Sequence, residues 1–157
     1  MNEDIEISPD TLVRLQAELE DLTTDGRDKM AERLQRAREL GDLKENAEYH
    51  AAKDSQGMME ARIRQLQHTL KNAVVRDVPT DLANVAPGLI VTIKDGDDED
   101  DYLFANSNEE KLAGFRTVTP SSPLGKALVG KKIGDVAEVA APSGRFSVTV
   151  TAIRPRP

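Results

Sequence analysis

Apolar residues recur with a helical period through much of the N-terminal half of the chain. In the clearer of two such segments, seam positions are separated by alternating steps of three and four residues, as in a coiled coil. These positions are Tyr49, Ala52, Gln56, Met59, Ile63, Leu66, Leu70 and Ala73. The earlier segment has Leu12, Leu15, Leu19 and Leu22, and its pattern resumes at Met30, Leu34 and Ala37. Because residues 23–26 interrupt it, we expect a kink or a short break near Gly26.

A short polar connection, Gly41-Asp42-Leu43-Lys44-Glu45-Asn46, separates the two segments. Two apolar stripes of similar length joined by a tight turn favour an antiparallel hairpin, because each stripe can cover the other. Ser8-Pro9 is a good start for the first arm, since Ser caps free amides and Pro is tolerated at the first helical position. About 30 residues per arm give a rod of about 45 Å. Asp42 and Glu45 would then lie at its far end.

The pattern changes beyond Asp77. Residues 77–88 contain Pro79 and Pro87 and have no helical period, which is typical of a boundary between domains. Short segments rich in β-branched and aromatic residues follow, at 89–93, 102–105, 115–118, 136–139 and 146–153. Ser122-Pro123-Leu124 opens one short helix that ends near Gly130. We therefore predict an α+β chain, with a helical hairpin in residues 1–78 and a small domain with an antiparallel sheet in residues 79–157.

Composition excludes several classes of site. The 157 residues include no Cys, so disulfides and thiolate metal sites are excluded, and this usage fits a reducing cytoplasm. Only 3% of residues are aromatic and none is Trp, which disfavours an aromatic-walled pocket or a base-stacking platform. No stretch approaches the roughly 20 apolar residues of a membrane span, and the N-terminus lacks a signal peptide. We expect a cytoplasmic protein with no membrane partner.

Charge is distributed unevenly along the chain. The net charge of −7 argues against a general affinity for nucleic acid. Residues 27–76, however, carry 11 Lys and Arg against 8 Asp and Glu. This excess is either an ordinary solvated helix surface or a face that tolerates nearby phosphate. The acidic run Asp95–Asp101 lacks the ligand spacing of a calcium loop, and we interpret it as a solvated hairpin connection.

Two interpretations of the acid pair in the connection stay open from spacing alone. Asp42-x-x-Glu45 has the spacing of a capping box, in which Asp42 would cap the second helix. Alternatively, the two carboxylates hold a hard cation such as Mg²⁺ and orient a metal-bound water. Two ligands are too few for a dedicated site, so a partner would have to supply the others. Tyr49 begins the seam and either packs in the core or takes part in the site.

The sequence as a whole resembles a known family. The run GDLKENAEYHAAKDSQGMMEARIRQLQHTLKNAVV at 41–75, with SSPLGKALVGKKIGDVAEVAAPSGRFSVTVTAI at 121–153, is similar to bacterial transcript cleavage factors of the Gre family, GreA type. The resemblance implies a coiled-coil hairpin followed by a domain similar to the FK506-binding proteins. It also implies docking of that domain on the rim of the RNA polymerase secondary channel, with the hairpin inside the channel. Such a factor is not itself an enzyme, but stimulates the polymerase's own cleavage of backtracked RNA.

The resemblance also assigns roles to residues. It implies that Asp42 and Glu45 help to hold a Mg²⁺ shared with the polymerase and position the attacking water. Arg38, Lys44 and Lys53 flank the tip, where they either contact phosphate or pair with neighbouring Glu. Together with Asn46 and Tyr49, they are predicted to lie near the nascent RNA 3′ end. The residues implied to contact the polymerase are Ser122, Pro123 and Leu124. We expect a monomer whose partners are bacterial RNA polymerase and, through it, the RNA.

The sequence departs from the family's usual pattern at two places. Ser121 stands where many relatives have Asn or Asp before Ser-Pro, and residues 23–27 also differ. Two alternative functions stay open from the sequence. One is an inhibitor that occupies the channel without stimulating cleavage. The other, by fold analogy alone, is a prolyl isomerase, whose pocket would need the aromatic residues of the second domain, namely Tyr102, Phe104, Phe115 and Phe146.

Overall fold

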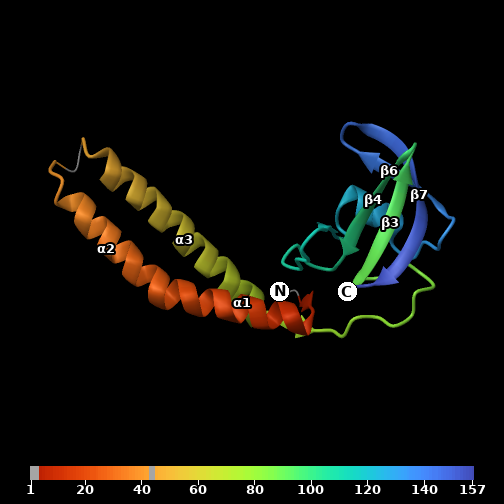
Figure 1. The fold of residues 1–157 in the computed structure, drawn as a ribbon, viewed down its shortest axis with the longest axis horizontal. Coiled ribbons are helices and arrows are strands. Elements are labelled where there is room, and N and C mark those ends of the chain that lie inside the picture. Colours follow the sequence, from red (N-terminus) through yellow and green to blue (C-terminus); the bar gives the residue numbers. More distant parts are fainter. Residues whose placement is uncertain (1–3, 43–44) are drawn as a thin grey trace. The chain divides into compact units, whose positions relative to one another are not determined.

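A computed structural model describes residues 4–42 and 45–157, which form two compact units (Figure 1). One unit contains Leu12–Ala73, and the other combines Asp4–Thr11 with Val74–Pro157. The first is helical and the second is built on a sheet, which confirms the predicted α+β class. The predicted division into residues 1–78 and 79–157 stays a prediction. No helix in the described ranges is long and apolar enough to cross a membrane.

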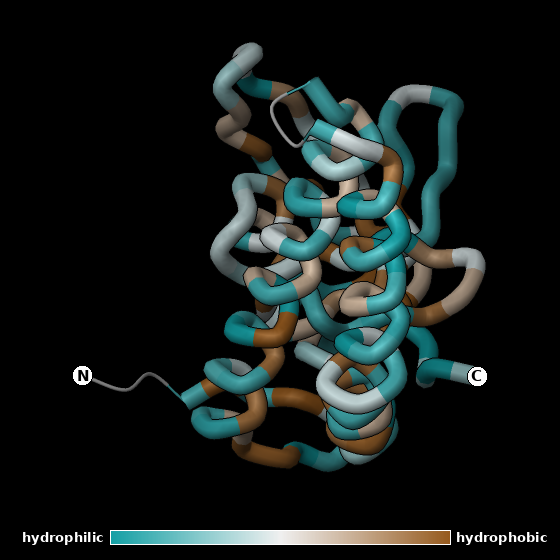
Figure 2. The backbone as a smooth tube through the Cα atoms, turned by 90° about the vertical axis from the view of Figure 1, so that its left-hand side faces the viewer, coloured by the Kyte–Doolittle hydropathy of each residue, from teal (hydrophilic) through white to brown (hydrophobic). Residues whose placement is uncertain are grey.

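The helical unit is an antiparallel hairpin. Its first arm consists of α1 (Pro9–Asp21), η1 (Leu22–Gly26) and α2 (Arg27–Arg38), and its second arm is α3 (Ala47–Lys71). Ion pairs between the arms join Glu18 to Arg62, Arg27 to Glu60 and Arg33 to Glu48. Residue numbers rise on the first arm as they fall on α3, which fixes the antiparallel direction. The predicted seam is confirmed at its buried positions, which are Leu15, Leu34, Ala37, Ala52, Ile63 and Leu66. Hydrophobic positions recur between hydrophilic ones along both arms (Figure 2).

The kink or short break expected near Gly26 corresponds to a π-helical segment, and the helix does not break there. The chain stays helical from Pro9 to Arg38, and the amide of Arg27 bonds to the carbonyl of Leu22, five residues earlier. The hydroxyls of Thr23 and Thr24 donate to the carbonyls of Leu19 (2.8 Å) and Glu20 (2.7 Å). A π-turn accommodates one more residue than an α-turn. It thereby absorbs the extra residue that interrupts the apolar pattern, and no break is needed.

The sheet unit contains a five-stranded sheet in the order β5-β4-β3-β7-β6. The strands are β3 (Leu89–Asp95), β4 (Asp98–Phe104), β5 (Arg116–Val118), β6 (Val136–Ala141) and β7 (Gly144–Pro155), with α4 (Pro123–Leu128) between β5 and β6. Three pairings are antiparallel as predicted, but β5 lies parallel to β4. Residues 105–115 connect these two strands by a crossover rather than a hairpin turn, so β5 starts again at the same end of the sheet. Leu128 of α4 joins the main core with alternate residues of β3, β6 and β7.

A second, two-stranded sheet joins β1 (Ile5–Ile7) to β2 (Ala73–Val75). Ala73 was predicted as the last seam position of the second helix, and this is wrong. The helix ends at Lys71, and both the backbone amide of Asn72 (3.2 Å) and its side-chain amide (2.9 Å) donate to the carbonyl of His68 in the last turn. Val74 and Val75 then favour an extended chain because both are β-branched.

The acidic run forms a hairpin, as predicted, although its turn is shorter than expected. Asp95 of β3 pairs with Asp98 of β4, and Gly96 takes a positive φ of 61° in the turn between them. Asp98 to Asp101 therefore belong to a strand. Arg154 of β7 donates to Asp101 at 2.8 Å, which offsets part of the negative charge on this strand.

Candidate functional site: the hairpin tip

The first arm ends in a turn that depends on glycine. After α2, the amide of Leu40 bonds to the carbonyl of Ala37 (3.2 Å), which tightens the last turn. Gly41 follows with a φ of +125°, a conformation that L side chains rarely adopt. Asp42, the next residue, is exposed. The turn thus reverses the chain and places the first acid of the connection in solvent.

Asn46 is the N-cap of the second arm. Its backbone is extended, and its side-chain Oδ1 accepts from the amide of Tyr49 at 3.0 Å. This geometry is that of an N-cap satisfying one of the free amides of a helix start. The capping-box interpretation, in which Asp42 caps this helix, is therefore wrong. Asn is as good a cap as Asp, and the helix begins at Ala47, so the cap is not at Asp42.

Asn46 and Tyr49 both contact the first arm at the tip. The amide Nδ2 of Asn46 donates to the carbonyl of Ala37 at the end of α2. The guanidinium of Arg38 lies over the ring of Tyr49, 5.9 Å from its centroid. Tyr49 is half-buried, so it packs at the end of the seam and also contacts a candidate site residue. The structure thus brings together three of the predicted tip residues, Arg38, Asn46 and Tyr49.

The other candidate residues of the tip are placed as follows. Glu45 is exposed and immediately precedes the cap. The ammonium of Lys53 donates to Gln56 on its own helix at 2.9 Å. Lys44 lies outside the described residues. Within residues 4–42 and 45–157, no three His, Cys, Asp or Glu side chains gather into a metal site. Asp42 and Glu45 are hard oxygen donors suited to Mg²⁺, which usually takes one or two carboxylates and completes its octahedron from elsewhere.

The predicted docking residues start α4 in the sheet unit. Ser122 is its N-cap and accepts from the amide of Gly125 at 3.1 Å, while its hydroxyl donates to the carbonyl of Thr119 at 2.7 Å. Pro123 and Leu124 form the first turn. A concave surface that encloses a volume of about 440 Å³ lies beside them. Its lining includes Ser121, Ser122, Pro123, Leu124, Val139 and Phe146. Of the four aromatic residues considered for an isomerase pocket, only Phe146 lines this concave surface. Phe104 is fully buried in the core.

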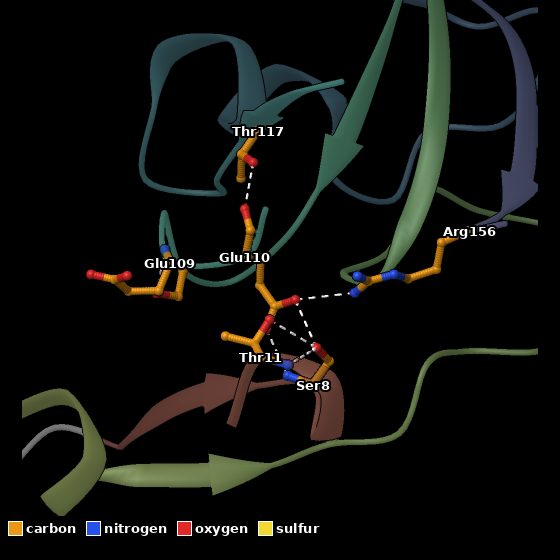
Figure 3. A network of polar contacts seen from close by, with 7 residues as sticks. Ser8, Thr11, Glu109, Glu110, Thr117 and Arg156 are labelled. Atoms are coloured by element: carbon orange, nitrogen blue, oxygen red, sulfur yellow. Dashed lines mark hydrogen bonds and ion pairs between the residues drawn. The ribbon is translucent and has the colours of Figure 1, made fainter. Parts of the chain in front are cut away.

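Sequence reasoning missed a polar network in the sheet unit (Figure 3). The carboxylate of Glu110, only 4% exposed, accepts from the amide of Ser8 (2.6 Å), the hydroxyl of Ser8 (2.9 Å) and the guanidinium of Arg156 (3.1 Å). Burial raises the pKa of Glu110, but the hydrogen bonds from Ser8, Thr11 and Arg156 lower it more, so its net pKa lies below the usual value. Ser8 also accepts from the amide of Thr11 (3.3 Å), as the predicted helix start requires. No local pattern marks Glu110, because its partners lie far away in sequence.

Comparison with known proteins assigns the chain to a family. Residues 5–75 match the family model described as "Transcription elongation factor, N-terminal", and residues 80–155 match "Transcription elongation factor, GreA/GreB, C-term". The chain belongs to the GreA/GreB family of transcription elongation factors. The boundary between its two matches falls at residues 76–79, just after β2.

Individual members of the GreA/GreB family match most of the chain. The transcription elongation factor GreA of Streptomyces avermitilis is 46% identical over 137 residues, which cover 85% of this chain and 82% of the relative. That of Saccharopolyspora erythraea is 40% identical and covers 96% and 93%. That of Acetivibrio thermocellus is 37% identical and covers 98% of each. The predicted resemblance to GreA-type factors is thereby confirmed.

Proposed function

We propose that this GreA-type factor binds RNA polymerase, inserts its hairpin tip into the secondary channel and stimulates the polymerase's own cleavage of backtracked RNA. The observation that carries the proposal is the pair of exposed carboxylates, Asp42 and Glu45, on the connection between the arms. The cap of α3 uses Asn46 instead, so helix capping does not explain why two acids are present there. The chain would act as a monomer in the cytoplasm and would not itself be an enzyme.

The tip residues fit a shared magnesium site. Asp42 and Glu45 would supply two carboxylate ligands, and the polymerase would supply the rest. A Mg²⁺ ion bound there would lower the pKa of a bound water and neutralise charge at the scissile phosphate. The carboxylates would orient that water, and the basic side chains of Arg38 and Lys53 would lie near the RNA phosphates. Lys44, in the same connection, is proposed for the same role.

The groove at the start of α4 would provide docking. Ser122 fixes the first turn by its two hydrogen bonds, which holds Pro123 and Leu124 at the edge of the concave surface. An apolar surface on a rigid helix start suits a side chain of the polymerase rim. Docking and chemistry would therefore belong to different units, and substitutions at the tip should leave binding intact.

The test is RNA cleavage by a deliberately backtracked polymerase, with and without the factor, across a Mg²⁺ titration. Asp42→Asn and Glu45→Gln should each reduce stimulated cleavage by at least about 10-fold, since altered metal-site residues typically cost 10- to 100-fold. Competition with labelled wild-type factor should show unchanged polymerase binding. Asp54→Asn, an exposed acid further along α3, is the matched control and should cleave like wild type.

Two outcomes would contradict the proposal. If the wild-type factor binds and only slows the polymerase, the chain is a channel-occupying inhibitor. If Asp42→Asn loses binding and cleavage to the same degree, the acids contribute to docking rather than to chemistry.

A further inference from the structure

The side chain of Asn46 bonds to both arms of the hairpin. Its Oδ1 accepts from the amide of Tyr49 on α3 (3.0 Å), and its Nδ2 donates to the carbonyl of Ala37 on α2 (2.5 Å). The orientation of the amide group is not arbitrary. Because the Tyr49 amide is a donor, it requires the oxygen, and the nitrogen must then face Ala37.

The group that Asn46 reaches on the first arm is well fixed. Ala37 is only 1% exposed and is the last buried residue of α2. Its carbonyl belongs to the last turn, where it has no regular helical donor four residues on and instead accepts from the amides of Glu39 and Leu40. Asn46 therefore ties the start of α3 to a rigid point on the other arm. The chain between them, residues 38–45, contains Asp42 and Glu45.

A helix cap alone does not require Asn at this position. Asp, Ser and Thr cap helices about as well, since a cap needs only an acceptor oxygen. Of these residues, Asn alone carries an amide that presents an acceptor and two donor hydrogens at the same reach. The second bond, to Ala37, is thus the feature that distinguishes Asn46 from an ordinary cap.

The other links between the arms near the tip are weaker. Arg33 and Glu48 are 3.8 Å apart, and both side chains are substantially exposed, so their attraction is screened by water. The contact of the Arg38 guanidinium with the Tyr49 ring is also at the surface, where such contacts contribute little. Asn46 is half-buried and makes the only amide-to-carbonyl bridge between α2 and the start of α3 in the described residues.

We infer that Asn46 is a positioning residue, which closes the connection between the arms by bonding both of them and so holds the Asp42 and Glu45 carboxylates in one arrangement. The inference rests on the proposed function for what the carboxylates do. Closure of the loop itself does not depend on that function, and it can be measured without the polymerase.

The decisive variant is Asn46→Ser. Ser retains the cap acceptor for Tyr49, but its hydroxyl is too short to reach Ala37 as well. Helix content and the thermal midpoint should stay near those of wild type, because Ser and Asn are equivalent caps. Amide exchange in residues 38–42 and 45 should become about 2- to 10-fold faster, the change in an opening equilibrium that one neutral hydrogen bond supports. Asn46→Asp, which keeps the shape and the acceptor but lacks the donor, should show the same faster exchange.

In the cleavage assay, Asn46→Ser should raise the Mg²⁺ concentration for half-maximal stimulation by a similar factor of about 2 to 10. The rate at saturating Mg²⁺ should remain within about twofold of wild type, because both carboxylates are still present. A residue that merely stabilised the helix would instead change the thermal midpoint and leave the Mg²⁺ dependence unaltered.

The outcomes separate the two proposals. If wild type fails to stimulate cleavage, the proposed function fails, while amide exchange still tests the loop closure. If Asp42→Asn is inactive but Asn46→Ser exchanges and responds to Mg²⁺ like wild type, the inference about Asn46 is overturned and the proposed function stands. Faster exchange with unaltered Mg²⁺ dependence would overturn it too, because loop closure would then not affect the carboxylates.

Discussion

Replacement of Glu110 by Gln is expected to destabilise the attachment of residues 4–11 within the sheet unit. The wild-type carboxylate accepts hydrogen bonds from the amide and hydroxyl of Ser8 and from the guanidinium of Arg156, and the hydroxyl of Thr11 also donates to it. Gln has nearly the same shape but only one acceptor oxygen. Its amide nitrogen would face a donor, either the Ser8 amide or the Arg156 guanidinium, so at least one buried donor loses its partner.

The expected cost follows from the burial and the number of bonds. Hydrogen bonds to charged groups contribute about 1.5–3 kcal/mol each, and they are not additive when they share one acceptor. Removal of one partner from a buried ion pair typically costs about 3–5 kcal/mol. Because Gln retains at least one of the bonds, we expect about 2–4 kcal/mol for Glu110→Gln. The full loss in Glu110→Ala should lie near the upper end of the ion-pair range.

Amide exchange is the appropriate assay, because a chain with two units need not unfold in a single transition. Amides of residues 4–11 should lose protection in Glu110→Gln, while those of β3 and β7 serve as an internal reference. Glu109→Gln is the matched control. Figure 3 shows the Glu109 carboxylate pointing away from the network, so this variant should change protection by less than about 0.5 kcal/mol. Equal effects of the two variants would refute the reasoning.

The pH dependence gives a second check on Glu110. Its pKa is lowered in the folded protein relative to the ordinary value of 4.5. A group with a lowered folded pKa stabilises the protein at pH values above its unfolded pKa, and this contribution is lost as the pH falls through the folded pKa. Protection of residues 4–11 should therefore decrease in wild type below about pH 4.5, and Glu110→Gln should lack this part of the decrease.

Two further predictions concern single residues of the backbone. Gly125→Ala should destabilise the sheet unit by at least about 2 kcal/mol in thermal unfolding, because a Cβ there would lie 1.7 Å from the carbonyl oxygen of Thr119. Gly57→Ala should instead stabilise the helical unit by about 0.5–1 kcal/mol, because a Cβ at this position of α3 would meet nothing within 4 Å. Deletion of Thr24 should convert η1 to regular α-helix and lower the free energy of unfolding by less than about 1 kcal/mol, measured by urea unfolding followed by circular dichroism. Deletion of Glu32 from α2 rotates the rest of the arm by about 100° and should lower it several times more. Equal costs for the two deletions would show that the π-turn does not absorb the extra residue.

The hairpin could be predicted because its signal is local and repeated. Each seam residue of α3 lies three or four positions from the next, so one helix face contains them all, and the buried positions Ala52, Ile63 and Leu66 follow from spacing alone. The interruption at residues 23–26 was also visible. Its form was not, because a π-turn and a helix break both shift the apolar pattern, and only the bonds of the Thr23 and Thr24 hydroxyls distinguish them.

Other features depend on residues that are distant in sequence. Strands β1 and β2 are each three residues long, and the helices of the hairpin lie between them in the sequence. Three residues are too few for an alternating pattern that would predict a strand. Glu110 becomes a buried acceptor only because Ser8 and Arg156 reach it from the two ends of the chain. The cap of α3 was misplaced for a different reason. Asp42 and Asn46 are equally suitable cap residues, and no sequence rule decides between two candidates four residues apart.

The identity of the cap residue changes what a tip mutation means. Had Asp42 capped α3, its replacement would have weakened a helix start by about 0.5–2 kcal/mol, and lost activity could be attributed to lost structure. With the cap at Asn46, the structural and chemical roles fall on neighbouring but different residues. Asp42→Asn and Glu45→Gln then alter charge while leaving the cap bond in place, and Asn46→Ser opens the loop while leaving both charges in place. Comparison of these variants in one Mg²⁺ titration therefore separates the charge of the tip from its geometry.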